Sequence, residues 1–284
     1  MDHWLHKTKE LFFSSSASSP REVFYLFTLT LLTLLLPLSF LLLSNLSAAQ
    51  FYLQRSNLFP CFLSLAPCNI LYILVFLLTL ASLIHCLTGK LTVFNVSPSS
   101  TSSSTSRLCT AWIILCTFQV CVGLGTEGSI VAGVYSDDSI SSFGVEKKSL
   151  LRRGVLGFLL GLHETTRFWS KVVVRPVVDD TVFGVAREER WVERLAVAAS
   201  LGTLWWWRLR GDVEILVVIA EVKKQRLMDL GMGDFFGWWL YYLTFTIGMA
   251  RVVKSFLWMC RICTSRRRAT RISMVEPSDN DYKV

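Results

Sequence analysis

The sequence has few charged residues, and long parts of it have none. Asp, Glu, Lys and Arg make up 18% of the 284 residues, whereas apolar residues make up 52%. No charged residue occurs in 23–54, 56–89 or 108–126. A helix needs about 20 mainly apolar residues to cross the roughly 30 Å hydrocarbon core of a bilayer, and each stretch can supply them. This scarcity of charge excludes an ordinary soluble domain.

The uncharged stretches predict an all-α, multi-pass helical membrane protein with four to five spans plus interfacial or re-entrant helices. The first apolar run is too long for the hydrophobic region of a signal peptide, so we interpret it as a retained anchor. A Trp- and Tyr-rich run near the C-terminus, flanked by basic residues, is expected to form the last span. The spans that we expect without ambiguity are Val23–Leu43, Cys68–Leu87, Leu108–Thr126 and Phe235–Trp258.

This pattern divides the chain into five regions. They are an N-terminal tail (1–22), a three-span membrane region (23–134), a polar segment with a short interfacial helix (135–193), a Trp-rich membrane-associated region with the last span (194–260) and a basic C-terminal tail (261–284). The serine-rich stretch 97–106, between the second and third spans, is interpreted as a flexible polar linker.

Two shorter apolar runs leave the span count open. Gly154–Leu162 is too short to cross a bilayer. Its glycines at 154, 157 and 161 share one helix face, so we expect a re-entrant or interfacial helix with a smooth packing strip. Leu195–Trp207 can be either a short span anchored by an aromatic belt or a helix lying flat in the interface. The flanking basic residues favour five spans on balance, with four as the alternative.

The eight cysteines lack the arrangement of a zinc site. Cys260 and Cys263 form a CxxC pair at the end of the last span, but no second pair completes a four-ligand site. We interpret these two residues as candidate palmitoylation sites, with an inert pair as the alternative. No metal and no other cofactor is predicted.

The sequence also lacks a complete catalytic motif. His163 and Glu164 begin HETTR, but Arg167 stands where HExxH has its second histidine, so zinc cannot be held in that way. We interpret HETTR as a hydrogen-bonded polar turn. Asp179 and Asp180 form a carboxylate pair that can bind a cation or belong to an ordinary charged turn. An intramembrane enzyme that uses these four residues is the third functional alternative.

The N-terminal spans lack the ionisable residues that mark most transport pathways. Apart from His85 near a helix end, the first three spans contain none. A small-solute transporter or channel is therefore the second functional alternative. The first is a non-enzymatic, membrane-anchored interaction or scaffold protein, whose protein partners would contact residues 135–234. Nucleic acid is not expected as a partner.

Positive charge is concentrated at the C-terminus. Residues 251–284 carry eight basic and three acidic residues, which accounts for most of the net charge of +8. Four arginines follow the last span closely, namely Arg266, Arg267, Arg268 and Arg271. We predict that they bind anionic lipid head groups of the bilayer, at about 1 kcal/mol each. Thr270 and Ser273 are candidate phosphorylation sites whose added negative charge would release the tail. A basic cluster that only fixes orientation is the alternative.

Two stretches of the C-terminal half resemble a known group of proteins. GLHETTRFWSKVVVRPVVDDTVFG (161–184) and the Trp-rich block 229–258 are similar to an uncharacterised family of multi-pass plant membrane proteins. The resemblance implies a helical membrane fold and no established activity or catalytic residues. A secretory-pathway membrane, such as the endoplasmic reticulum or the plasma membrane, is the expected location.

Overall fold

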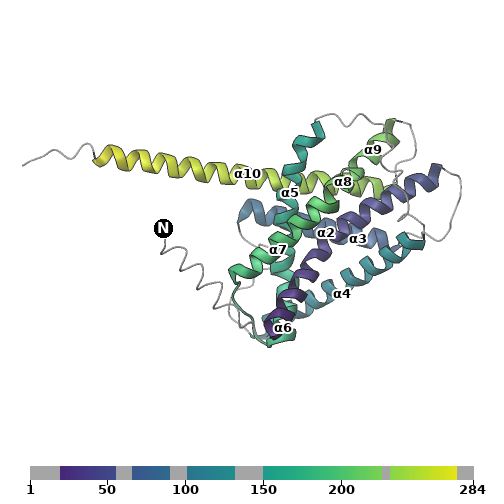
Figure 1. The fold of residues 1–284 in the computed structure, drawn as a ribbon, viewed down its shortest axis with the longest axis horizontal. Helices are drawn as coiled ribbons and strands as arrows, with labels where there is room; N and C mark the ends of the chain where they lie inside the picture. The colour runs from purple at the N-terminus through teal and green to yellow at the C-terminus, as the bar shows by residue number, and fades with distance from the viewer. Residues whose placement is uncertain (1–19, 56–65, 90–100, 132–149, 226–230, 274–284) are drawn as a thin grey trace, which may run out of the picture.

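The computed structural model describes residues 20–55, 66–89, 101–131, 150–225 and 231–273. These residues form a bundle of helices without a strand, so the predicted all-α class is confirmed (Figure 1). The elements are α2 (Pro20–Arg55), α3 (Ala66–Thr88), α4 (Thr101–Val131), α5 (Leu150–Trp169), α6 (Arg175–Phe183), α7 (Trp191–Leu204), α8 (Arg210–Asp212), α9 (Ile215–Gln225) and α10 (Met232–Ser273). Two π-helical turns, η4 (Ser170–Val174) and η5 (Trp205–Leu209), join α5 to α6 and α7 to α8.

Among the described residues, four helices are long and apolar enough to cross a membrane. Their apolar segments are Pro20–Ala49, Asn69–Thr88, Ser106–Glu127 and Met232–Ser265. They contain the three N-terminal spans and the last span that the sequence predicts. The candidate for a fifth span lies in α7, which has 14 residues and is not one of the four. By length and hydropathy, four helices of the described residues therefore qualify as spans, and α7 is not among them.

Two predictions of local structure are wrong. α4 begins at Thr101, so most of the predicted linker 97–106 is helical rather than flexible. Extending an existing helix costs far less than starting one, which allows the apolar helix to continue into the serine-rich stretch. The predicted helix Gly154–Leu162 is also longer, because α5 runs on through HETTR, which is therefore helical and not a turn.

α2 is the central helix of the bundle. It packs against every other α-helix that the structure describes, and Leu36, Phe40 and Leu43 on its inner side are completely buried. Near its N-terminus, by contrast, Phe24 and Phe27 are more than half exposed. Apolar side chains on the outside of such a helix are expected where it faces lipid.

α5 and α10 cross with their backbones in contact. A Cβ atom at Gly161 would collide with the carbonyl oxygen of Thr244, and one at Gly248 would collide with the carbonyl oxygen of Gly157. Only residues without a side chain permit this approach. The predicted glycine strip is therefore confirmed at positions 157 and 161.

An ion pair lies one helical turn beyond the crossing on both helices. Arg251 of α10 donates from Nη1 to Glu164 Oε2 at 2.7 Å, and the same nitrogen lies 2.9 Å from His163 Nδ1. Both partners belong to α5. The pair is partly buried, with Arg251 33% and Glu164 18% exposed, so the carboxylate of α5 has a cationic partner beside the crossing.

The chain from α5 to α6 runs antiparallel to α2. These elements form one uninterrupted helical stretch, 150–183. Trp169 Nε1 donates to the carbonyl of Leu32 at 3.0 Å, and ten residues later Asp179 Oδ1 accepts from Tyr25 OH at 2.7 Å. The π-helical turn η4 comes immediately before Pro176. A proline ring clashes with the carbonyl four residues earlier in a regular α-helix, and the wider turn relieves this clash.

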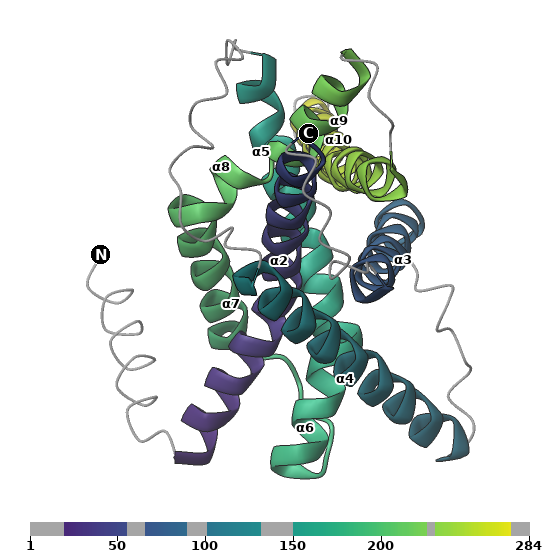
Figure 2. The ribbon, with the colours of Figure 1, turned by 90° about the vertical axis from the view of Figure 1, so that its right-hand side faces the viewer.

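The next stretch, 191–212, folds back and runs parallel to α2. At its beginning Arg190 forms an ion pair with Glu22, and at its end the carbonyl of Asp212 accepts a hydrogen bond from Ser44. In each contact the two residues are 168 positions apart in the sequence. The stretch 191–212 therefore stays in the same register with α2 from the first contact to the second. Figure 2 shows α2, α7 and the α5–α6 stretch side by side.

Candidate anion-binding pocket

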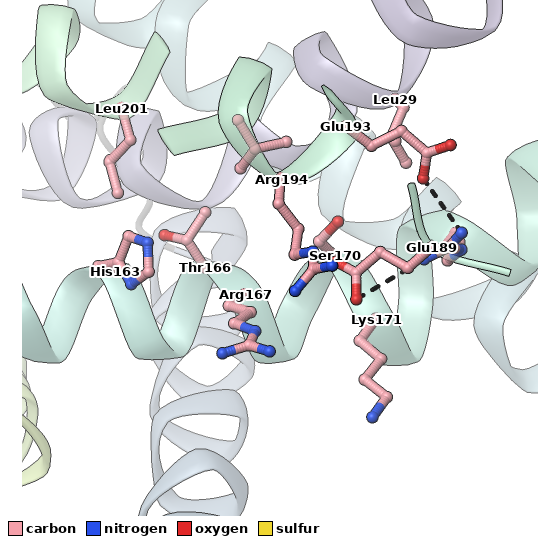
Figure 3. Close-up of a pocket in the computed structure, with 12 residues that line it drawn as sticks. Leu29, His163, Thr166, Arg167, Ser170, Lys171, Glu189, Glu193, Arg194 and Leu201 are labelled. Atoms are coloured by element: carbon pink, nitrogen blue, oxygen red, sulfur yellow. Dashed lines mark hydrogen bonds and ion pairs between the residues drawn. The ribbon is translucent and has the colours of Figure 1, made fainter. Parts of the chain in front are cut away.

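A cavity of about 130 Å³ lies where η4 and the adjoining turns of α5 and α6 face α7 and α2 (Figure 3). This volume is roughly ten times the space that one water molecule needs in a cavity. Its charged and polar lining comes from α5, η4, α6 and α7, and an apolar part comes from Leu29, Val197 and Leu201. We call this cavity the polar pocket.

Three cationic side chains of the polar pocket have no acidic partner. Arg167 and Lys171 are one helical turn apart on α5 and η4, and Arg194 comes from α7. Figure 3 shows Arg194 extending from α7 toward the helix that carries Arg167 and Lys171. Among the described residues, none of the three makes an ion pair or a side-chain hydrogen bond. All three side chains are exposed, so an anion that enters the pocket from outside would meet positive charge from two helical stretches.

Two polar atoms inside the polar pocket lack a hydrogen-bond partner. The hydroxyl of Thr166 is buried, with the side chain 1% exposed, and finds no acceptor or donor among the described residues. Arg175 Nε is buried without a hydrogen bond as well. Arg175 Nε faces Asp179 Oδ2 at 3.6 Å. Buried polar groups are nearly always paired in folded proteins, so the Thr166 hydroxyl is a place for a ligand atom or a water.

The acidic side chains at one end of the polar pocket are already paired. Arg175 Nη2 lies 3.1 Å from Glu193 Oε2, and Nη1 lies 4.0 Å from Glu189 Oε2. Arg175 also approaches Asp179 at 3.6 Å, whose other oxygen accepts from Tyr25. The lining as a whole carries four cations, Arg167, Lys171, Arg175 and Arg194, against two carboxylates, Glu189 and Glu193, so its formal charge is +2.

The candidate catalytic and cation-binding residues lie in two separate places. His163 lines the polar pocket, and Glu164 pairs with Arg251. Asp179 is buried in the network with Arg175, whereas Asp180 is exposed. The two groups are about 15 residues apart on one helical stretch, or more than about 20 Å. They do not form one catalytic site.

The aspartate pair lies in a helix and not in a turn. Both residues lie in α6, which ends at Gly184 in the left-handed conformation at φ 69°. Asp179 and Asp180 therefore point to different environments, and the interpretation as a charged turn is wrong. Within the described ranges, no group of three or more His, Cys, Asp or Glu residues is placed to hold a metal ion.

The predicted modification and lipid-binding residues lie on the outer part of α10, which extends away from the bundle (Figure 1). Cys260 and Cys263 are exposed there. The backbone remains helical to Ser273 and so includes all the predicted tail residues. The side chains of Arg266, Arg267, Arg268, Thr270, Arg271 and Ser273 lie outside what the structure describes.

Sequence reasoning missed the polar pocket. The spacing of Arg167 and Lys171 is visible, since residues four apart share a helix face. Arg194 is 23 positions beyond Lys171 and joins them only because the chain reverses after α6. No local pattern indicates which of the many arginines would meet there.

Comparisons with protein-family models, curated proteins and solved structures gave no match to this chain. Function therefore has to follow from the polar pocket itself. The pocket offers positive charge and hydrogen-bond donors. Its serine, Ser170, shares a hydrogen bond with Thr33 rather than with His163, so the arrangement suits binding better than nucleophilic catalysis.

Proposed function

We propose that the protein is a non-enzymatic integral membrane protein that binds a small anion in the polar pocket. The observation that carries the proposal is that Arg167, Lys171 and Arg194, three exposed cations without an ion pair among the described residues, line one cavity. The unpartnered hydroxyl of Thr166 in the same cavity supports it. An anion would reduce the repulsion between the three cations. It would also accept hydrogen bonds from them and from the Thr166 hydroxyl.

A role in membrane-anchored interactions is compatible with this proposal. α10 continues from the bundle to Ser273 as one helix, so the arginine-rich turns directly follow an apolar segment. Such a tail would bind anionic lipid head groups. Protein partners through residues 135–234, membership of the plant family and a secretory-pathway location stay predictions.

The experiment is a thermal-unfolding titration of the detergent-solubilised full chain with inorganic phosphate at constant ionic strength. A ligand that binds only the folded state stabilises it, by about 2.7 kcal/mol at 100 times its Kd. We expect phosphate to raise Tm for the unaltered protein and to raise it much less for Lys171→Gln or Arg194→Gln.

Lys224→Gln is the matched control, because Lys224 is exposed on α9 and does not line the polar pocket. It should respond to phosphate like the unaltered protein. If the control loses the shift as much as the pocket variants do, phosphate acts through general charge and the proposal is wrong.

A further inference from the structure

The polar pocket lies beside α2, which is long enough to cross a bilayer. Contacts along α2 show how much of its length the stretch 191–212 follows. Glu22 of α2 meets Arg190, and Ser44 meets Asp212. Each interval is 22 residues, or about 33 Å of helix at 1.5 Å per residue. This matches the roughly 30 Å hydrocarbon thickness of a membrane. The stretch 191–212 therefore accompanies α2 over the full depth that α2 can span.

The α5–α6 stretch covers the same depth in the opposite direction. The rings of Phe158 and Phe40 are 6.0 Å apart near one end, and Tyr25 bonds Asp179 near the other. The two stretches thus form a helical hairpin beside α2, with its tip at the N-terminal end of α2. Both arms carry charged side chains. Some of them pair with a partner from another helix, as Glu164 does with Arg251, whereas the three pocket cations are exposed at the polar pocket.

The polar pocket sits near the middle of this depth. Leu29 lines it, and Thr33 bonds the pocket residue Ser170. These α2 residues are 7 and 11 positions beyond Glu22, or roughly 10 to 17 Å along the helix. Ionisable residues at mid-membrane depth usually mark a solute pathway, and π-helical turns such as η4 are frequent at functional sites.

We propose that the hairpin crosses the membrane with α2 and that the protein carries a small oxyanion of the phosphate class across the membrane through the polar pocket. This inference deepens the proposed anion binding and rests on it. The ligand class follows from the donors, because guanidinium and ammonium groups with the hydroxyl of Thr166 suit an ion with several acceptor oxygens. The hairpin supplies the ionisable residues that the N-terminal spans lack.

Sidedness tests the hairpin. Single cysteines are placed at Ala186, exposed at the tip, and at Arg210, exposed near the other end, in an otherwise cysteine-free full chain. The probe is a membrane-impermeant maleimide, applied to sealed vesicles of one orientation. The proposal requires the two positions to label from opposite faces. Labelling of both from the same face would show that the hairpin does not cross and would overturn the inference.

Flux tests the transport step. The full chain is reconstituted into liposomes, and uptake of radiolabelled inorganic phosphate is compared with that of empty liposomes. We expect saturable uptake that falls at least tenfold in Arg194→Gln and Lys171→Gln and persists in the Lys224→Gln control. Arg194→Lys keeps the charge and should retain most of the uptake, which separates loss of the cation from misfolding.

The outcomes of the two measurements distinguish transport from the anion binding on which it rests. Phosphate-dependent stabilisation without uptake, in vesicles with the protein correctly inserted, would leave anion binding standing and overturn transport. Absence of both stabilisation and uptake would overturn the two together. Uptake unaffected by Arg194→Gln and Lys171→Gln would exclude the polar pocket as the pathway.

Discussion

At the scale of single residues, one ion pair of the bundle is almost completely buried. Lys223 of α9 and Asp234 of α10 lie 2.6 Å apart with side chains only 4% and 3% exposed. Asp234 also accepts a hydrogen bond from the backbone of Gly231 at 3.2 Å. The pair fixes the first turn of α10 against α9. Removing one partner of such a pair is costly because the other charge stays buried without compensation.

We therefore expect Lys223→Met to destabilise the protein by about 3–5 kcal/mol. The double variant Lys223→Met with Asp234→Leu should recover much of the loss, since it removes the orphaned carboxylate. Denaturant unfolding in detergent measures both. If the double variant is as unstable as the single one, lost packing rather than the buried charge is the cause.

At the scale of helices, the crossing of α5 and α10 depends on glycine. The backbones touch at Gly161 and Gly248, and the Arg251–Glu164 pair lies one turn further on. A methyl group cannot enter between the carbonyl oxygens without separating the helices. Overpacking of a well-packed contact typically costs 1–3 kcal/mol.

Gly161→Ala should therefore lower stability by about 1–3 kcal/mol, measured as a fall in Tm. Gly202→Ala on α7 is the matched control, because a Cβ there meets nothing within 4 Å. In an open helical position alanine is better than glycine by roughly 0.5–1 kcal/mol, so this control should be neutral or stabilising. Equal Tm values for the two variants would mean that the crossing tolerates a side chain.

At the scale of the whole molecule, the number of crossings fixes the sides of the termini. The four candidate spans among the described residues give an even number, and the proposed hairpin adds two more. The arginine-rich tail is expected on the cytoplasmic face. An even number places the N-terminus on that face too, whereas the five-span alternative would place it on the other.

We expect epitope tags at both termini to be digested together by protease added to intact microsomes, and both to survive in vesicles of inverted orientation. Digestion of only one tag would require an odd number of crossings and would contradict the even count. The test is independent of the polar pocket, so its result does not depend on any ligand.

The sequence by itself determined the class and the main spans. In lipid, a long uncharged run is expected to form a helix, because backbone N–H and C=O groups without water must hydrogen-bond within the segment. The resulting predictions, such as Val23–Leu43 within α2, hold because hydropathy is a property of a continuous stretch. The glycine strip of α5 was visible for a similar reason, since residues on one helix share a fixed spacing.

The tertiary structure alone decided what the charged half of the chain does. Gly154–Leu162 looked too short because charges bound it, yet α5 and α6 continue past it, with Glu164 paired to Arg251. Arg194 lines the same pocket as Arg167 only because the chain reverses after α6 and keeps a common register with α2. Whether a charge ends a helix, pairs or faces a cavity depends on neighbours from distant parts of the chain, and a local pattern does not contain them.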